Sequence, residues 1–175
     1  MQNTFRMDSV AGRSYEIRVE EVDELHADLV RTVIEIDLQT FFESTFSYYT
    51  AAAFLKNGRV FLLHADDSVI GTFVCMRCWE RPNEVMILSM GIRPGWRGKG
   101  LGQHFVMGVL QKLSQRGIRS VSLMIGEDNK RAIRVYQEVG FEVMDETSED
   151  PKTGETYVFM RRKLQDDVSP MLFPG

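Results

Sequence analysis

Hydrophobic and polar positions in the first third of the chain follow two different periods. Residues 15–19 alternate apolar and polar positions, which predicts a half-buried strand. Over residues 20–42 the apolar positions recur every three or four residues, which predicts an amphipathic helix. The members of that stripe are Leu25, Leu29, Val33, Ile36 and Thr40. A second helix is expected over 44–56 with Asn57-Gly58 as its C-cap, whereas residues 1–13 are expected to form a loose lead-in.

The middle of the chain favours strands. Residues 60–64 and 68–79 are rich in apolar and β-branched positions, and the short polar stretch 65–67 between them predicts a hairpin turn. Pro82-Asn83 interrupts the chain, and the apolar run 85–92 predicts the next strand.

The C-terminal half begins with a four-spaced apolar stripe that predicts a helix over 101–113, ended by Gly117. The stripe consists of Leu101, Phe105, Val109 and Leu113. Residues 119–125 alternate and predict a strand. Strand, helix and strand in this order form a β-α-β unit, so we expect strands 85–92 and 119–125 to be parallel with a right-handed crossover.

The remaining pattern completes a mixed α/β fold. A helix is expected over 129–139, ended by Gly140, and strands are expected over 141–145 and 157–163. The polar stretch 146–155 is expected to be a loop, and 165–175 an irregular tail. The sequence therefore predicts a single domain over 1–175, with a mixed, strongly twisted sheet of six or seven strands flanked by about four helices.

Composition narrows the class of function. Hydrophobic residues make up 43% of the 175 residues, enough for a packed core. The net charge is −4 with cations and anions mixed, so we expect no nucleic-acid partner. The apolar runs are short and interrupted, so we expect no membrane association. Cys75 and Cys78 lie in a strand-like run without a second Cys or His pair, which indicates reduced thiols in a cytoplasmic protein and no metal.

The stretch 91–102 combines glycines with cations between a predicted strand and a predicted helix. Glycine lets backbone amides approach a ligand closely, and amides at a helix N-terminus favour anions. Arg93, Arg97 and Lys99 add positive charge. A phosphate-bearing ligand is therefore expected here. The spacing fits neither the dinucleotide fingerprint nor the P-loop, because Gln103 fails the last glycine position of the former and Gly100 follows Gly98-Lys99 where the latter needs Ser or Thr.

Two motifs remain. The first is Arg97-x-x-Gly100-x-Gly102, and the second is Asn129-x-x-Ala132-x-x-x-Tyr136-x-x-x-Gly140-Phe141. Helical geometry places the named residues of the second motif within one stripe of roughly 80° up to Gly140. Small Ala132 permits a close approach on that face, where Tyr136 presents its hydroxyl.

Both motifs at this spacing resemble those of the GNAT superfamily of N-acetyltransferases, over roughly residues 85–141. The resemblance implies acetyl-CoA as cosubstrate. Backbone groups near Met90 and Ile92, beside Gly91, would pair with the pantetheine, and the Ile92 amide would polarise the acetyl carbonyl. The pyrophosphate would bind the loop amides, which belong to Arg97, Gly98, Lys99, Gly100, Leu101 and Gly102.

The resemblance also assigns the second motif. Asn129 and Ala132 would face the pantetheine or phosphate arm of the cofactor, and Tyr136 would protonate the departing thiolate.

The sequence does not match the family pattern at the positions of the general base. The two positions at which relatives carry a glutamate hold Met86 and Met124. Glu84, two residues from Met86 on the same face of the expected strand, is the leading candidate for the catalytic base. An ordinary structural carboxylate is the alternative reading of Glu84, and a water chain to a distant carboxylate is a further option. Weaker candidates are Glu80, Glu127, Ser89 and His64.

The acceptor is expected to bind near residues 35–57, 78–84 and 146–156. Acidic and aromatic side chains there suit a cationic amine, although they are equally compatible with an ordinary acidic surface. They are Glu35, Asp37, Glu43, Tyr48, Tyr49, Trp79, Glu80, Glu149 and Asp150. The acceptor is either a small amine or a protein N-terminus or lysine. A non-catalytic acyl-CoA-binding or regulatory domain is the alternative function, and a homodimer is one option for the oligomeric state.

Overall fold

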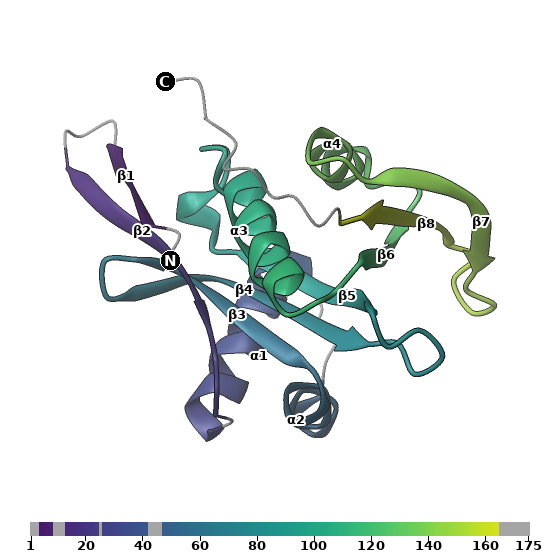
Figure 1. Cartoon of the computed structure of the whole chain (residues 1–175), viewed down its shortest axis with the longest axis horizontal. Coiled ribbons are helices and arrows are strands. Elements are labelled where there is room, and N and C mark those ends of the chain that lie inside the picture. The colour runs from purple at the N-terminus through teal and green to yellow at the C-terminus, as the bar shows by residue number, and fades with distance from the viewer. Residues whose placement is uncertain (1–3, 9–12, 25, 42–46, 165–175) are drawn as a thin grey trace. The chain divides into compact units, whose positions relative to one another are not determined.

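The computed structural model describes residues 4–8, 13–24, 26–41 and 47–164. In these residues eight strands and four α-helices form a mixed α/β fold, as predicted, although six or seven strands were expected (Figure 1). The elements are β1 (Thr4–Asp8), β2 (Ser14–Glu21), α1 (Ala27–Phe41), α2 (Tyr48–Asn57), β3 (Arg59–Ala65), β4 (Ser68–Arg77), β5 (Glu84–Ile92), the 3-10 turn η1 (Pro94–Trp96), α3 (Leu101–Gln115), β6 (Ser120–Gly126), α4 (Lys130–Glu138), β7 (Glu142–Glu149) and β8 (Thr156–Lys163).

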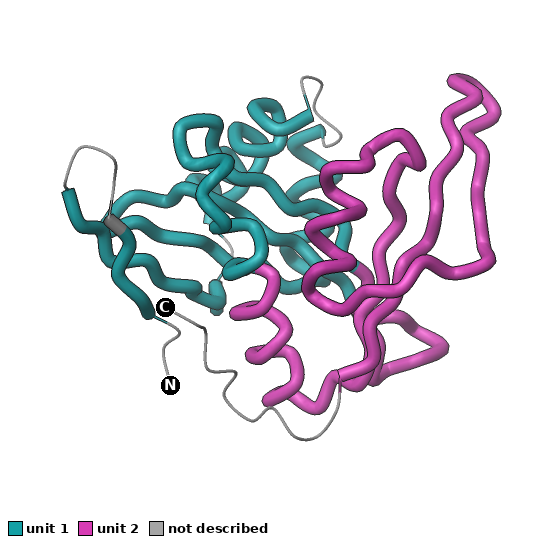
Figure 2. Tube along the Cα trace, turned by 90° about the horizontal axis from the view of Figure 1, so that it is seen from above, with its two compact units in different colours: residues 1–76, 87–105 teal, residues 77–86, 106–175 magenta. Residues whose placement is uncertain are grey.

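The chain divides into two compact units (Figure 2). Unit 1 comprises residues 1–76 and 87–105, and unit 2 comprises 77–86 and 106–175. Strand β5 and helix α3 each contribute residues to both units. That the whole chain behaves as one domain stays a prediction.

Unit 1 contains antiparallel strands in the order β1-β2-β3-β4-β5. Strand β1 pairs with β2 in a register that places Phe5 opposite Ile17. The expectation of a loose lead-in is therefore wrong for residues 4–8. The predicted hairpin between β3 and β4 is confirmed, and its turn places Asp66 at a φ of 51°.

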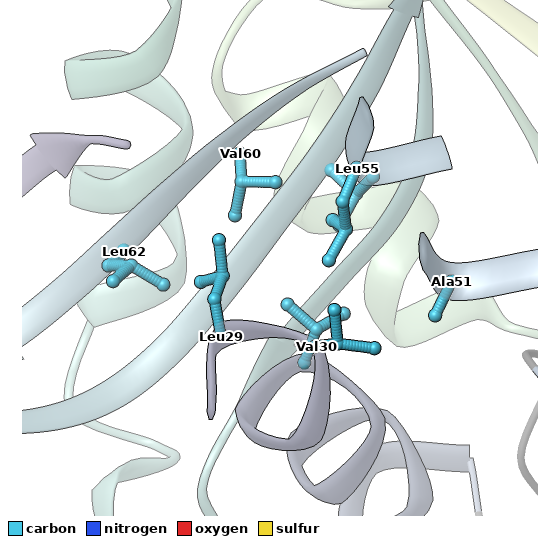
Figure 3. Packing of buried hydrophobic residues seen from close by; sticks show 8 residues of the cluster. Leu29, Val30, Ala51, Leu55, Val60 and Leu62 are labelled. Atoms are coloured by element: carbon cyan, nitrogen blue, oxygen red, sulfur yellow. The ribbon is translucent and has the colours of Figure 1, made fainter. Parts of the chain in front are cut away.

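Helices α1 and α2 bury their apolar faces against β3 and β4 in unit 1. Figure 3 shows this cluster, in which side chains from both helices meet those of β3. Its buried members are Leu29, Val30, Val33, Ala51, Leu55, Val60, Leu62 and Val74. The stripe predicted for α1 thus faces the core, except that Leu25 lies outside the described residues.

Contacts at Ser47 and Gly58 explain where helix α2 begins and ends. Ser47 accepts a hydrogen bond from the Thr50 amide (3.1 Å) and so caps the first turn. The predicted start at residues 44–46 lies outside the described residues. Gly58 ends the helix as predicted, but for a different reason, because a Cβ there would lie 2.4 Å from the Cys75 carbonyl of β4.

Unit 2 contains antiparallel strands in the order β6-β8-β7, followed along the chain as β6, α4, β7 and β8. Gly117 and Gly140 end α3 and α4 with φ of 79° and 83°, as their positions predicted. Strand β7 extends to Glu149, so the expected loop at 146–155 is shorter than predicted. In the part of the chain that the structure describes, no helix is both long and apolar enough to cross a membrane.

Candidate functional site

The glycine loop has the geometry that an anion site needs. Gly98 and Gly100 adopt φ of 76° and 73°, and no protein atom lies within 4 Å of a Cβ built at either position. Helix α3 begins at Leu101, so the amides of its first turn, including Gly102, have no acceptor within the helix. These residues fit a phosphate bound by backbone amides at a helix N-terminus.

The side chain of Arg97 fastens this loop instead of facing outward. Its guanidinium donates to the carbonyl oxygens of Ile92 and Gln39, both at 2.7 Å, and lies 3.4 Å from the Thr40 hydroxyl. The arginine of the first motif therefore ties the strand end, the loop and α1 together. Its hydrogen-bond donors are used within the protein, and the expectation that its charge favours a bound phosphate stays a prediction.

Arg93 is also held within unit 1. It donates to Glu35 (2.6 Å) and to the Val69 carbonyl (3.0 Å), and its guanidinium keeps the pKa of the Glu35 carboxyl below its usual range. Lys99 donates to the Gly95 carbonyl and lies 5.0 Å from the ring centre of Trp96. Of the three cations that the sequence suggested, Lys99 is the exposed one.

Strand β5 meets α1 at very short range next to this loop. A Cβ on Gly91 would lie 2.6 Å from the Thr40 hydroxyl oxygen and 2.8 Å from Ile36 Cγ2. Only glycine fits there without displacing α1. The close contact places residues 36–40 of α1 beside Ile92, whose amide the resemblance assigns to the acetyl carbonyl.

Strand β5 also carries one residue more than the part of β4 that it pairs with. The Arg93 amide donates to Ile70, and the Cys78 amide donates to Glu84. Between these two bonds lie seven residues on one side (71–77) and eight on the other (85–92). The counts are equal in a regular antiparallel ladder, so β5 contains a β-bulge.

The bulge lies at Leu88 and Ser89. Leu88 packs against the apolar cluster beneath α1 and α2, and its neighbour Ser89 donates a hydrogen bond to Asp37 of α1. Neighbouring residues of a regular strand point to opposite faces, whereas these two point to the same one. The bulge thus turns the Ser89 hydroxyl toward a carboxylate (Oγ to Oδ1, 2.9 Å), and both residues are buried.

The second motif lies in unit 2, on α4. Asn129 caps this helix, with its Oδ1 accepting from the Ala132 amide at 3.2 Å. Tyr136 is buried and packs edge-to-face on Phe141, with 5.3 Å between ring centres. Burial raises the pKa of the Tyr136 phenol, so the hydroxyl stays protonated and able to donate.

Glu84, the leading candidate for the base, is surrounded by donors. Its Oε1 lies 3.1 Å from Arg81, 3.2 Å from the Ser122 hydroxyl and 3.6 Å from Arg161. The side chain is 6% exposed. These contacts are those of a structural ion-pair cluster. An open pocket of about 290 Å³ adjoins it and is lined by Arg81, Pro82, Asn83, Glu84, Arg119 and Ser120.

The weaker candidates for the base lie elsewhere. His64 of β3 contacts Arg18 through Nδ1 (3.2 Å) and Glu20 through Nε2 (3.0 Å). Burial, with Arg18 adding to it, lowers the pKa of His64. Glu80 and Glu127 are both exposed, each in the segment that follows a strand.

The acidic and aromatic residues proposed for the acceptor do not form one group. Glu35 pairs with Arg93, and Asp150 accepts from two amides of its own turn. The exposed members are Glu35, Tyr48, Tyr49, Trp79, Glu80 and Glu149. Glu43 lies outside the described residues. Asp37 differs from all of these, because it is buried against β5.

Strands β1 and β2 support the glycine loop, which no sequence pattern predicted. Phe5 stacks on His104 of α3 at 4.6 Å between ring centres, and Tyr15 meets Trp96 edge-to-face at 4.8 Å. These rings brace both ends of the loop. Regarding metals, the described ranges contain no group of three His, Cys, Asp or Glu side chains that could hold an ion.

Comparison with known proteins agrees with the motifs. Residues 22–141 match the model of the acetyltransferase (GNAT) family. A mycothiol acetyltransferase of Thermobifida fusca is 36% identical over 59 residues, which cover 34% of this chain and 18% of that protein. One from Streptomyces coelicolor is 37% identical over 82 residues, covering 46% and 26%. The chain thus spans about a fifth to a quarter of the length of these curated relatives.

Solved structures agree in fold. The ribosomal-protein-S18-alanine N-acetyltransferase of Escherichia coli superposes with a TM-score of 0.71 at 16% identity, covering 89% of this chain and 99% of that one. A Bacillus subtilis acetyltransferase in complex with CoA gives 0.66 at 19% identity, covering 85% and 99%. Because the family model covers more than half of the sequence, the chain belongs to the GNAT family of acetyltransferases.

Proposed function

We propose that this protein transfers an acetyl group from acetyl-CoA to a primary amine, by direct attack of the amine on the thioester. The observation that carries the proposal is the loop with two left-handed glycines opening onto the N-terminus of α3. Backbone amides in this arrangement suit the pyrophosphate of CoA. Neighbouring structures with CoA or acetyl-CoA bound support the choice of ligand.

Different backbone groups of this chain bind the cofactor and stabilise the reacting carbonyl. The amides from Arg97 to Gly102 hold the pyrophosphate, and Met90 and Ile92 pair with the pantetheine through their backbones. The Ile92 amide donates to the acetyl oxygen as negative charge develops on it, and the contacts that Arg97 makes keep this strand end in place. Gly91 has no side chain, which lets α1 lie against this strand.

Helix α4 supplies the acid. The Tyr136 hydroxyl protonates the departing thiolate, and its raised pKa keeps the proton available at neutral pH. Asn129 has used its carbonyl oxygen for the helix cap, so its amide nitrogen is the group left to contact the cofactor. Glu84 has a structural role in this proposal, because two arginines and a serine surround its carboxylate.

The acceptor is an amine of either class that the sequence allows. Relatives named mycothiol acetyltransferase support a small molecule, and the neighbour named for a ribosomal-protein alanine supports a polypeptide N-terminus. A thiol-release assay with acetyl-CoA and four acceptors separates them. The acceptors are serine, glucosamine, spermidine and a hexapeptide that begins with alanine.

Turnover with one acceptor class, reduced at least tenfold by Tyr136→Phe, is the expected result. Binding of CoA without turnover for any acceptor would instead favour the non-catalytic alternative. Unchanged turnover in Tyr136→Phe would contradict the assignment of the acid.

A further inference from the structure

We propose that Ser89 and Asp37 form the proton-accepting pair of the reaction, with Ser89 contacting the acceptor amine and Asp37 acting through it. The inference rests on the proposed function. It assigns the proton acceptor that the family pattern leaves open, since Met86 and Met124 occupy the positions where relatives carry a glutamate.

The burial of the Asp37 carboxylate on the inner face of α1 requires a physical explanation. Asp37 is 1% exposed and lies between Ile36 and Leu38 on α1, a helix whose inner face is otherwise apolar. Burying a carboxylate costs several kcal/mol unless polar groups compensate it, so helices rarely place one on the inner face. The Ser89 hydroxyl donates to Asp37 Oδ1 at 2.9 Å, and a β-bulge turns this serine toward it. Bulges of this kind often re-aim a side chain beside an active site.

The pair lies next to the strand end where the acetyl group is expected. Gly91 brings β5 against Ile36 and Thr40 of α1, and Arg97 joins the Gln39 and Ile92 carbonyls. Residues 36–40 therefore flank residues 89–92 within unit 1. From Val85 to Ile92, Ser89 is the single residue with a polar side chain.

The charged neighbours on both flanking elements are already engaged. On α1, Glu35 pairs with Arg93 from the segment after β5. On the glycine loop, the Arg97 guanidinium binds carbonyl oxygens. Glu84 at the other end of β5 is held by Arg81 and Arg161. Asp37 is thus the carboxylate of α1 that faces β5 and hydrogen-bonds to one of its side chains.

The proton transfer balances without a further reactant. A serine hydroxyl that donates its hydrogen keeps lone pairs that can accept another. The acceptor binds as an ammonium ion, and one N–H proton passes to Ser89 Oγ as the Oγ–H proton passes to Asp37 Oδ1, which frees the nitrogen lone pair. As nitrogen then bonds to the acetyl carbon, the carbon–sulfur bond breaks, the second N–H proton leaves to water, and the thiolate takes the Tyr136 proton. Asp37 then loses its proton to water and Tyr136 regains one, which leaves an amide and a thiol.

The test compares Asp37→Asn with Asp28→Asn, in the presence of the best acceptor from the panel above. Asp28 is on the same helix, but it is exposed and pairs with Arg31. Asp37→Asn is expected to lower kcat/KM at pH 7 by about 100-fold, a typical contribution of a positioned base. Asp28→Asn should stay within twofold of the wild type, and both variants should keep the CoA-induced rise in melting temperature.

The pH profile separates a proton acceptor from a merely structural residue. In Asp37→Asn, kcat/KM should rise tenfold per pH unit until the acceptor amine itself loses its proton, so that the deficit shrinks at high pH. An equal loss at every pH would overturn the proposal. Ser89→Ala is a smaller change, and its kcat/KM should fall at least tenfold. This second variant keeps the test valid if Asp37→Asn fails to fold. Turnover within twofold of the wild type in Ser89→Ala would also overturn it. Absence of turnover in the wild type would contradict the proposed function itself, which is a distinguishable result.

Discussion

Replacing Gly91 by alanine tests the close contact between β5 and α1, on which the position of the Ile92 amide depends. The added Cβ would lie 2.6 Å from the Thr40 hydroxyl oxygen and 2.8 Å from Ile36 Cγ2. Thr40 cannot move away freely, because its hydroxyl donates to the Ile36 carbonyl at 2.7 Å and lies 3.4 Å from the Arg97 guanidinium. Helix α1 must therefore shift away from the strand.

The free energy of unfolding should fall by about 2 kcal/mol. Overpacking of a buried contact costs about 1–3 kcal/mol. Loss of the Thr40 hydrogen bond adds about 1 kcal/mol. Restricting the unfolded chain returns about 0.4–1 kcal/mol, because alanine has fewer conformations than glycine. For a chain of this length the net loss corresponds to a melting temperature about 4–8 °C lower.

Thermal and urea unfolding followed by circular dichroism measure the effect. Gly95→Ala is the matched control, because its Cβ would have no heavy atom within 4 Å and its φ lies outside the left-handed region. It should leave the melting temperature unchanged or slightly raised. If Gly91→Ala melted within 1 °C of the wild type, the account of this contact would be refuted.

Three further predictions concern a thiol, a carboxylate and a helix cap. Burial raises the pKa of Cys75 from 9.0 to about 12, so the unfolded state loses its proton first as pH rises. Wild-type stability should therefore fall between pH 8 and 10 by about 1.4 kcal/mol more than that of Cys75→Val, measured by urea unfolding; parallel losses would contradict this. Glu84→Gln should lower stability by about 1–3 kcal/mol and keep turnover below the melting temperature, because it breaks a buried ion-pair cluster; a folded variant without turnover would restore Glu84 as the base. Ser47→Ala should cost about 1 kcal/mol in urea unfolding because it removes the α2 cap, and an unchanged midpoint would show that the cap contributes nothing.

Local signals in the sequence were sufficient for most of the fold. Helix α4 begins after Asn129 and ends before Gly140, because side-chain capping and a left-handed glycine are local effects. Strand β1 was missed because five residues with two apolar positions are too few for a periodic signal. The second half of β7 was missed because its residues are polar and exposed, so pairing with β8 rather than burial defines it.

Some residues of the candidate site could likewise be predicted from local sequence signals, and others could not. The glycines of the loop were recognisable, since positive φ is a property of single residues. The role of Arg97 was not, because its acceptors on α1 lie 57 and 58 positions away along the chain. Asp37 did leave a signal. It follows Val30 and Val33 at helical spacing, which places a carboxylate on the buried face of α1.

Binding of CoA to the glycine loop is the central claim, and titration calorimetry tests it most directly. Gly100→Trp would fill the space in front of the loop amides, whereas Gly154→Trp places the same side chain at a φ of 72° and in equally open surroundings on another loop. The account predicts one CoA site in the wild type and in Gly154→Trp, and an affinity at least about 100-fold weaker in Gly100→Trp, a difference of about 2.7 kcal/mol. Equal affinity in all three proteins, or no heat with the wild type, would contradict it.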